Sequence, residues 1–115
     1  MPAVAHHLVL ELAARASVYL YSAGVATAES ALVDSGYLTR DDIGELVRRG
    51  AVGDVVGRYV DAAGRVVDAA LDARTIGIDI DRLRSARTAI FVVAGEAKQE
   101  IARAVVSHGL CSTLV

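Results

Sequence analysis

Lys98 stands out chemically because it follows an apolar run that ends in glycine. The run at 88–94 predicts a strand, and the residues after Gly95 are expected to begin a helix. Free backbone N–H groups at the start of such a helix attract anions, and ligands of open α/β sheets bind at this end of the strands. A lysine there complements a phosphate or carboxylate ligand. The alternative is a solvated lysine, partly neutralised by Glu96 and Glu100.

Asp54 is the second candidate, because it lies between Gly53 and an apolar stretch that predicts a strand at 54–60. A carboxylate at a strand start can accept hydrogen bonds from sugar hydroxyls. Two other roles fit the same position. Asp54 can cap a turn, as aspartate often does, or pair with Arg58 on the same stretch. The residues alone leave these roles open.

No catalytic or metal site is assembled by the sequence. The nucleophile elbow, the Walker phosphate loop and the glycine-rich dinucleotide fingerprint are all missing. His6 and His7 are adjacent, so they cannot share a helix face as metal ligands do. We therefore expect a protein that is not an enzyme and that carries no cofactor or metal.

Length and composition predict one small domain, residues 1–115, with an aliphatic core. Hydrophobic residues make up 54% of the chain but aromatic residues only 4%, so the core must be built mainly from alanine, valine, leucine and isoleucine. A chain of 115 residues buries only about two-thirds of its surface on folding. Some apolar surface is therefore expected to meet a partner, and we expect a homo-oligomer.

The charge pattern argues against direct contact with nucleic acid. The formal net charge is −2, and the basic residues form no continuous stripe. The N-terminus does not resemble a secretion signal, and no apolar stretch reaches the ~18 residues of a membrane span. We expect a cytoplasmic protein that does not bind a membrane. Cys111 is the only cysteine, which rules out an intramolecular disulfide.

The elements that must position these residues follow from periodicity and from helix or strand punctuation. Helices are expected at 4–15, within 26–35, at 39–49, at 80–86 and at 96–108. Strands are expected at 17–22, 54–60, 65–67, 88–94 and 110–115, with a turn at 61–64 and an irregular segment at 68–74. The strand at 88–94 is expected to be buried on both faces, as in parallel sheets. With the helix and strand that follow, it predicts a βαβ unit.

Local signals refine three of these helices. Thr39 and Asp42 have the spacing of a capping box, and Asp79 is placed to cap the helix at 80–86. The side chains expected to face the core are Ile43, Leu46 and Val47 in the helix at 39–49, and Ile101, Val105 and Val106 in the helix at 96–108.

An ordered set of short motifs resembles a known family. The set comprises Gly36-Tyr37-Leu38-Thr39, Gly50-Ala51-Val52-Gly53-Asp54, Asp61 with Gly64, Arg74 with Ile76-Gly77-Ile78, Leu83-Arg84, and Val93-Ala94-Gly95 with Lys98. Over roughly residues 8–115, its order and spacing resemble the C-terminal part of the effector-binding domain of SorC/DeoR-type sugar-responsive transcription regulators. The resemblance implies an α/β, Rossmann-like three-layer sandwich related to phosphosugar isomerases, present here as a partial domain with a mainly parallel sheet.

The resemblance also implies a function. It implies a non-catalytic domain that senses a phosphorylated sugar or related small effector, with changes in oligomeric assembly on binding. Asp54 matches the residue that contacts sugar hydroxyls, Lys98 the lysine beside the ligand, and Gly95 the nearby backbone turn. In the family a second glycine frequently follows the position of Gly95. Here Glu96 stands in its place and adds negative charge near the expected anion site. DNA binding is expected only through a helix-turn-helix domain that this chain lacks.

Two other classes of function fit parts of the sequence. A ligand-free dimerisation module would complete its sheet with a partner chain along the last strand, 110–115, which is expected to lie at an edge. An enzyme such as a phosphosugar isomerase is compatible with the related fold, but the chain lacks a convincing acid–base pair.

Overall fold

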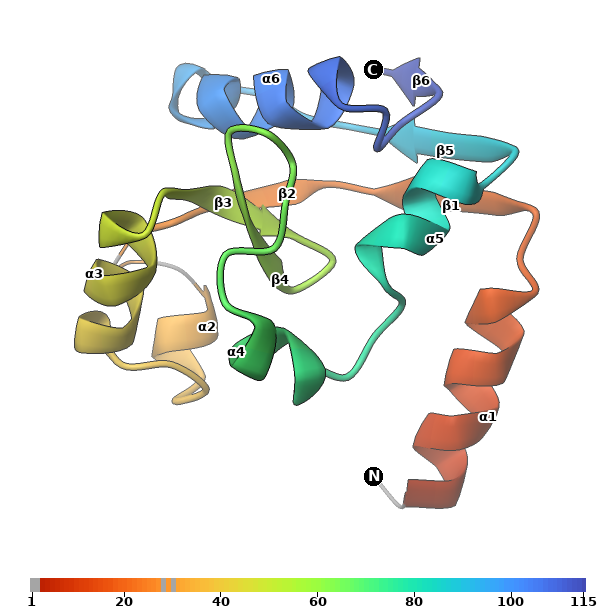
Figure 1. Ribbon diagram of the computed structural model, residues 1–115. Coiled ribbons are helices and arrows are strands. Elements are labelled where there is room, and N and C mark those ends of the chain that lie inside the picture. Colours follow the sequence, from red (N-terminus) through yellow and green to blue (C-terminus); the bar gives the residue numbers. More distant parts are fainter. Residues whose placement is uncertain (1–2, 28, 30) are drawn as a thin grey trace.

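A computed structural model describes residues 3–27, 29 and 31–115. Figure 1 shows that the first helix, α1 (Ala3–Ala14), stands apart from the body of the molecule at the start of the chain. The remaining helices are α2 (Ala31–Asp34), α3 (Arg40–Arg48), α4 (Ala69–Ala73), α5 (Ile80–Ser85), the 3-10 turn η1 (Glu96–Lys98) and α6 (Gln99–Ser107). The strands are β1 (Val18–Tyr21), β2 (Ala23–Val25), β3 (Ala51–Val55), β4 (Arg58–Asp61), β5 (Thr88–Phe91) and β6 (Thr113–Leu114).

The strands form two small sheets that share one extended segment. Strands β1, β5 and β6 form a parallel sheet in the order β1-β5-β6, and β2, β3 and β4 form an antiparallel sheet in the order β2-β3-β4. Only Ser22 separates β1 from β2, so one stretch of chain joins the sheets. The predicted βαβ unit is confirmed, because β5 and β6 are parallel and α6 connects them. The α/β class with a parallel sheet is confirmed as well.

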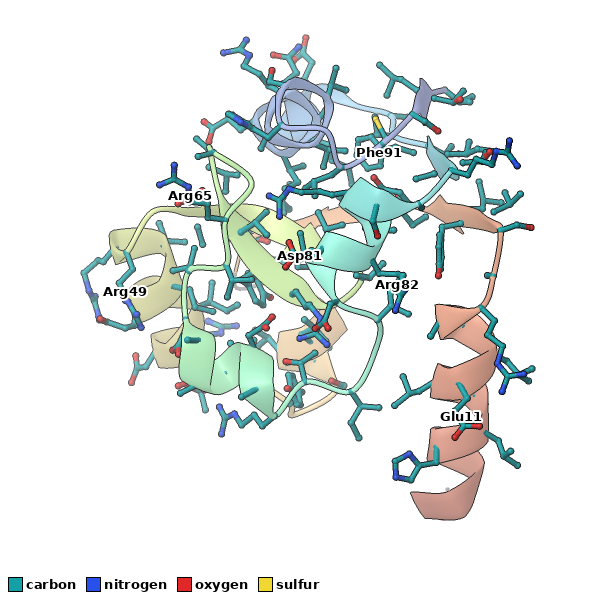
Figure 2. All side chains as sticks on the ribbon, turned by 45° about the vertical axis from the view of Figure 1, so that its right-hand side comes forward. Glu11, Arg49, Arg65, Asp81, Arg82 and Phe91 are labelled. Carbon is teal, nitrogen blue, oxygen red and sulfur yellow. The ribbon has the colours of Figure 1, made fainter. Side chains whose placement is uncertain are left out.

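The parallel sheet has one face in the main core. Its side chains Tyr19, Tyr21, Ala89 and Phe91 are buried and cluster with Leu83 of α5 and with Ile101 and Val105 of α6. Phe91 is fully buried, and its ring lies 5.3 Å from that of Tyr21 (Figure 2). Burial of such aliphatic and aromatic side chains is the main favourable term in the folding of the domain.

The opposite face of the parallel sheet differs from the prediction. The strand expected at 88–94 to be buried on both faces ends at Phe91, and Val92 is exposed. Thr88 and Ile90 are only half-buried, because α5 and α6 pack against the other face. Val18 and Leu20 of β1 are exposed for the same reason.

A second, smaller core lies beside the antiparallel sheet and confirms most of the α3 prediction. It contains Leu38, Ile43, Leu46, Ala51, Tyr59 and Leu71. The capping box is present: the Thr39 N–H donates to Asp42 Oδ2 at 2.9 Å, and the Asp42 N–H donates to Thr39 Oγ1 at 3.0 Å. The inward placement of Val47 and Val106 was wrong, since both lie at the border of their helix's apolar face and are 46% exposed.

The strand predicted at 54–60 is in fact a tight hairpin. Strands β3 and β4 pair antiparallel and are joined by the two residues Val56 and Gly57. Both have positive φ, 49° and 84°, the backbone that a two-residue hairpin with native twist requires. The return expected at 65–67 after the turn does pair with β4. Val66 bridges Val60, the Asp61 N–H donates to the Arg65 carbonyl at 2.9 Å, and the Val67 N–H donates to the Tyr59 carbonyl at 3.1 Å.

The segment 68–74, expected to be irregular, contains the helix α4. Asp68 caps it, because its carboxylate accepts hydrogen bonds from the N–H groups of Ala70 at 3.0 Å and Leu71 at 3.1 Å. Asp79 does precede α5 as predicted, but its side chain accepts no capping hydrogen bond there.

Arg58 ties α4 and the loop after it to the hairpin. It is the only buried charged side chain among the residues whose burial the structure describes, with 5% exposure. Its guanidinium donates to the carbonyl oxygens of Ile78 at 2.8 Å, Asp72 at 2.8 Å and Gly77 at 3.0 Å. It also forms a salt bridge of 2.8 Å with the Asp72 carboxylate. The alternative pairing of Asp54 with Arg58 is therefore not the one adopted.

Of the helices that the structure describes, none combines the length and apolar character needed to cross a bilayer.

Candidate functional site

The structure brings Asp54 and Lys98 to one cavity of about 560 Å³. The cavity lies where the end of β2, the β3–β4 hairpin and η1 meet. Its described lining residues are Gly24, Val25, Thr27, Glu29, Leu32, Asp54, Gly57 and Lys98. Residues more than 40 positions apart in the sequence thus share one surface, which is the arrangement expected of a binding site.

Asp54 lies near the end of β3, opposite Gly24 of β2 and Tyr59 of β4, and not at a strand start as predicted. The absence of a side chain at Gly24 makes room for it, because a Cβ at Gly24 would overlap the Asp54 carboxylate. The carboxylate also accepts a hydrogen bond from the Gly57 N–H. Asp54 therefore supports the hairpin turn and faces the cavity at the same time.

The electrostatic state of Asp54 reflects two opposing influences. Burial raises the pKa of its carboxyl above the ordinary value, because the charged form is poorly solvated there. The Gly57 hydrogen bond and the Lys98 charge lower that pKa part of the way back. A partly buried carboxylate that can still accept hydrogen bonds is stabilised by a ligand that donates them.

Lys98 is the last residue of η1, at the start of α6, as the sequence predicted. Lys98 is half-buried, and its backbone N–H donates a hydrogen bond to the Gly95 carbonyl at 3.2 Å. Its charge reaches Asp54, yet it forms no salt bridge with any carboxylate that the structure describes. The two opposite charges thus lie across a cavity with room for a ligand between them.

Gly95 lies outside the lining of this cavity, and its place is at the turn that leads into η1. Its φ of 98° is a conformation that glycine adopts without penalty. A Cβ there would meet nothing within 4 Å, so the backbone conformation and not close packing explains the glycine. Gly95 positions the turn that carries Lys98.

Sequence reasoning missed the residues that follow β2. Thr27 and Glu29 place polar groups on the cavity, and Leu32 adds an apolar side chain. The usable signal was Gly24, which marks a close approach inside a strand pattern. The strand expected at 17–22 stops before Gly24, so no role was predicted for the segment that follows it.

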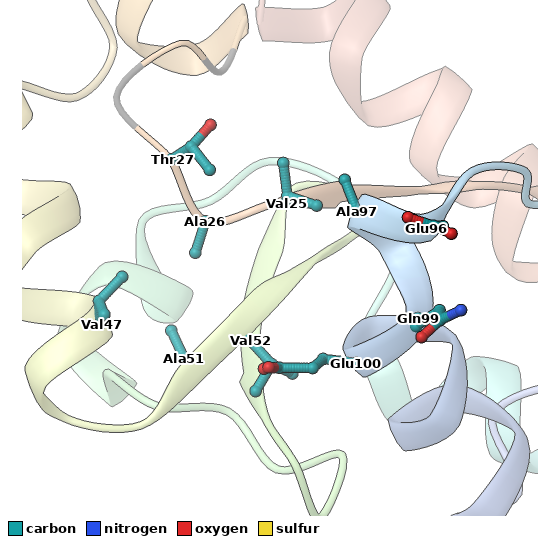
Figure 3. Close-up of a pocket in the computed structure, with 10 residues that line it drawn as sticks. All are labelled: Val25, Ala26, Thr27, Val47, Ala51, Val52, Glu96, Ala97, Gln99 and Glu100. Atoms are coloured by element: carbon teal, nitrogen blue, oxygen red, sulfur yellow. The ribbon is translucent and has the colours of Figure 1, made fainter.

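Figure 3 shows the residues that line a second hollow, of about 440 Å³. The two hollows share Val25 and Thr27, at the end of β2. Its polar side chains are Thr27, Glu96, Gln99 and Glu100, and its apolar ones come from the end of β2, α3, β3 and η1. Along η1 and the start of α6, Lys98 therefore faces one hollow, while Glu96 and Glu100 face the other.

The chemistry available here is recognition. Lys98 offers an ammonium group, Asp54 and Glu29 offer acceptors, and Thr27 offers a hydroxyl that donates or accepts. Within the described part of the chain, no group of three histidine, cysteine or acidic side chains could hold a metal ion. A ligand with an anionic group and several hydroxyls matches these partners.

Comparisons with known proteins show which family this chain resembles. Residues 4–115 match the family described as "Putative sugar-binding domain". The deoxyribonucleoside regulator of Bacillus subtilis (strain 168) is 31% identical over 90 residues, which cover 78% of this chain and 28% of that protein. A solved DeoR family transcriptional regulator from Listeria monocytogenes is 25% identical, with a TM-score of 0.86, over 95% of this chain and 44% of that one. The sorbitol operon regulator SorC from Klebsiella pneumoniae is 24% identical, with a TM-score of 0.81, over 96% and 36%, and shows the fold alone.

The chain belongs to the family of sugar-binding domains found in DeoR/SorC-type transcription regulators, as the motif resemblance predicted. The shared fold confirms the predicted class, a partial α/β domain with a parallel sheet. The chain spans 28% and 32% of the length of two curated relatives, the Bacillus regulator and the erythritol catabolism regulatory protein EryD of Brucella abortus (strain 2308).

Proposed function

We propose that this chain is a non-catalytic effector-sensing unit that binds a phosphorylated sugar or a closely related small effector. In this proposal Lys98 binds the anionic group of the effector, Asp54 accepts hydrogen bonds from its hydroxyls, and Gly95 sets the backbone turn beside it. The single observation that carries the proposal is that Asp54 and Lys98 face one cavity without neutralising each other in a salt bridge. Family membership supports the ligand class.

The remaining properties follow from the same proposal. Residues 1–115 act as one unit, in the cytoplasm, where phosphorylated sugars are made. In this proposal the chain turns over no substrate and acts by recognition alone. It acts on DNA only through a helix-turn-helix domain, and it assembles as a homo-oligomer.

One observation favours a second candidate, an interaction module that pairs along its sheet edge. Strand β6 is one of the two edge strands of the parallel sheet, and Leu114 on it is exposed. An unpaired strand edge is a template for another strand. Sedimentation equilibrium at low micromolar concentration tests this candidate, and a monomer there would contradict it.

The effector proposal is tested by thermal unfolding with and without a panel of sugar phosphates. A ligand at 100 times its Kd stabilises the native state by about 2.7 kcal/mol. For a domain of this size, that raises Tm by roughly 10 °C. Lys98→Ala is expected to weaken binding at least about tenfold, because a charged hydrogen bond to the ligand is lost. Arg103→Ala is the matched control: it removes an exposed cation of α6 that does not line the cavity, and the ligand response should persist.

Lys98 is also the only lysine of the chain, which makes a direct test available. Amine-selective acylation, followed by mass spectrometry, reports on this single side chain apart from the N-terminus. A bound sugar phosphate should protect Lys98 and leave the N-terminal amine unprotected. Equal labelling with and without every sugar phosphate, together with an unchanged Tm, would remove the proposal.

A substitution at Gly24 tests Asp54 without removing its carboxylate. Gly24→Ala places a methyl group where the Asp54 side chain now lies, and that side chain must rotate away. We expect a small change in stability, because the displaced group is the end of a side chain, but at least about a tenfold loss of sugar affinity. Isothermal titration calorimetry measures the sugar affinity. Unchanged affinity would show that the ligand does not contact Asp54 in its present position.

A further inference from the structure

We propose that the hollow beside Glu96 and Glu100 makes this site selective for effectors with a single phosphate, because it receives a hydroxyl-bearing part of the ligand and repels a second phosphate. The inference rests on the proposed function, since it concerns the charge class of the same effector.

The first step is the order of charges along one short piece of backbone. Glu96, Lys98 and Glu100 alternate in sign over η1 and the start of α6. With a rise of about 1.5–2 Å per residue, the two glutamates lie within roughly 8 Å of each other along the axis, with Lys98 midway. Like charges in solution still repel over about 8 Å at physiological salt. An anion in either hollow therefore experiences all three side chains.

The second step is how these charges divide between the hollows. Lys98 lines the cavity of about 560 Å³ with Asp54, whereas Glu96 and Glu100 line the hollow of about 440 Å³. The described lining of the second hollow includes no lysine or arginine that would neutralise the two glutamates. Val25 and Thr27 border both hollows, so the two hollows adjoin at the end of β2. In this proposal a ligand bound at Lys98 extends past these two residues into the second hollow.

The third step is the hydrogen-bonding character of the second hollow. Figure 3 shows Glu96 on η1 and Gln99 and Glu100 at the start of α6, with Thr27 across from them, just after β2. Ionised carboxylates only accept hydrogen bonds, while the amide and the hydroxyl both donate and accept. Sugar hydroxyls satisfy such a set. A phosphate at neutral pH is also an acceptor with negative charge, so it competes with the glutamates for donors and is repelled by them.

The test compares two ligands with the same carbon skeleton, a ketohexose 6-phosphate and the corresponding 1,6-bisphosphate, by isothermal titration calorimetry at fixed ionic strength. A ribose 5-phosphate and ribose 1,5-bisphosphate pair repeats the test on a shorter skeleton. The parent chain should bind each monophosphate about tenfold or more tightly than its bisphosphate. The variant Glu96→Gln/Glu100→Gln should reduce that ratio to about threefold or less, chiefly through tighter binding of the bisphosphate.

The matched control removes two exposed acids elsewhere, in the variant Glu11→Gln/Asp81→Asn. These residues lie on α1 and α5 (Figure 2), and neither of them lines either hollow. The control has the same net charge as the test variant and should keep the parent's ratio. A parent chain that binds the bisphosphate as tightly as the monophosphate, or a test variant with an unchanged ratio, would overturn the inference. If none of the four ligands binds the parent chain, the proposed function itself fails.

Discussion

Replacing Arg58 with methionine is expected to destabilise the fold by about 3–5 kcal/mol, the usual effect of breaking a buried ion pair from one side. Methionine fills a similar volume, but the Asp72 carboxylate loses its ion-pair partner, and the carbonyls of Ile78 and Gly77 lose their hydrogen-bond donor. Buried acceptors without partners are costly, because water satisfied them in the unfolded chain. In a domain of 115 residues this corresponds to a fall in Tm of roughly 10–20 °C.

Urea unfolding followed by circular dichroism measures the change. Arg48→Met is the control, since Arg48 pairs with Glu45 on the exposed surface of α3, where removal of an ion pair changes stability by less than about 1 kcal/mol. Arg58→Lys should fall between the two, because lysine keeps the charge but not the planar array of donors that reaches four carbonyls. Equal stability of the two methionine variants would show that the buried network contributes nothing net.

The sequence was sufficient where the determining interactions are local. The Thr39–Asp42 capping box forms as its spacing predicts, and the run before Gly95 does become a parallel strand followed by Lys98. These features depend on residues within one or two turns of each other. The α4 helix was missed although its signal was also local, since Asp68 before an alanine-rich segment is a usable N-cap.

The hairpin was missed for a different reason. Two-residue hairpins usually carry Asn-Gly or Asp-Gly, and here the first turn residue is Val56, with a positive φ that a β-branched residue rarely adopts. The alternation of apolar residues therefore continues through the turn and imitates one strand. Pairing with β2 and the Arg58 network in the folded protein impose the turn. Tertiary contacts of this kind leave no periodic trace in the sequence.

The candidate site shows the same division between local and distant interactions. Lys98 could be found from its place after a strand, and the family resemblance added Asp54. No role could be assigned to Thr27 and Glu29, because their position depends on how the chain passes from β1 in one sheet to β2 in the other. Asp54 has its present position on the cavity because Gly24 of the neighbouring strand leaves room for the Asp54 side chain. A contact between two strands about 30 positions apart cannot be read from either segment alone.

Asp54→Asn is expected to stabilise the unliganded protein at neutral pH while weakening sugar binding, an exchange typical of functional residues. Burial raises the pKa of the Asp54 carboxyl in the native state, so the native state prefers the protonated, neutral form. Such a group contributes stability below its unfolded-state pKa, taken as 3.8, and loses it as pH rises through the higher folded-state pKa. Asparagine remains neutral at every pH and can still accept the Gly57 hydrogen bond through its carbonyl oxygen.

The stability advantage of Asp54→Asn over the parent should therefore be absent below about pH 3.8 and reach its full size above the folded-state pKa. There we expect a rise in Tm of a few degrees, equivalent to on the order of 1 kcal/mol. Sugar phosphate affinity should fall about tenfold or more at pH 7, because the amide is a weaker acceptor of hydroxyl hydrogen bonds than the ionised carboxylate. Thermal unfolding from pH 3 to pH 8, with and without ligand, measures both effects. A variant that is less stable than the parent at pH 7 would show that the Lys98 attraction outweighs burial, and that the two side chains form a structural pair and not the two sides of a ligand site.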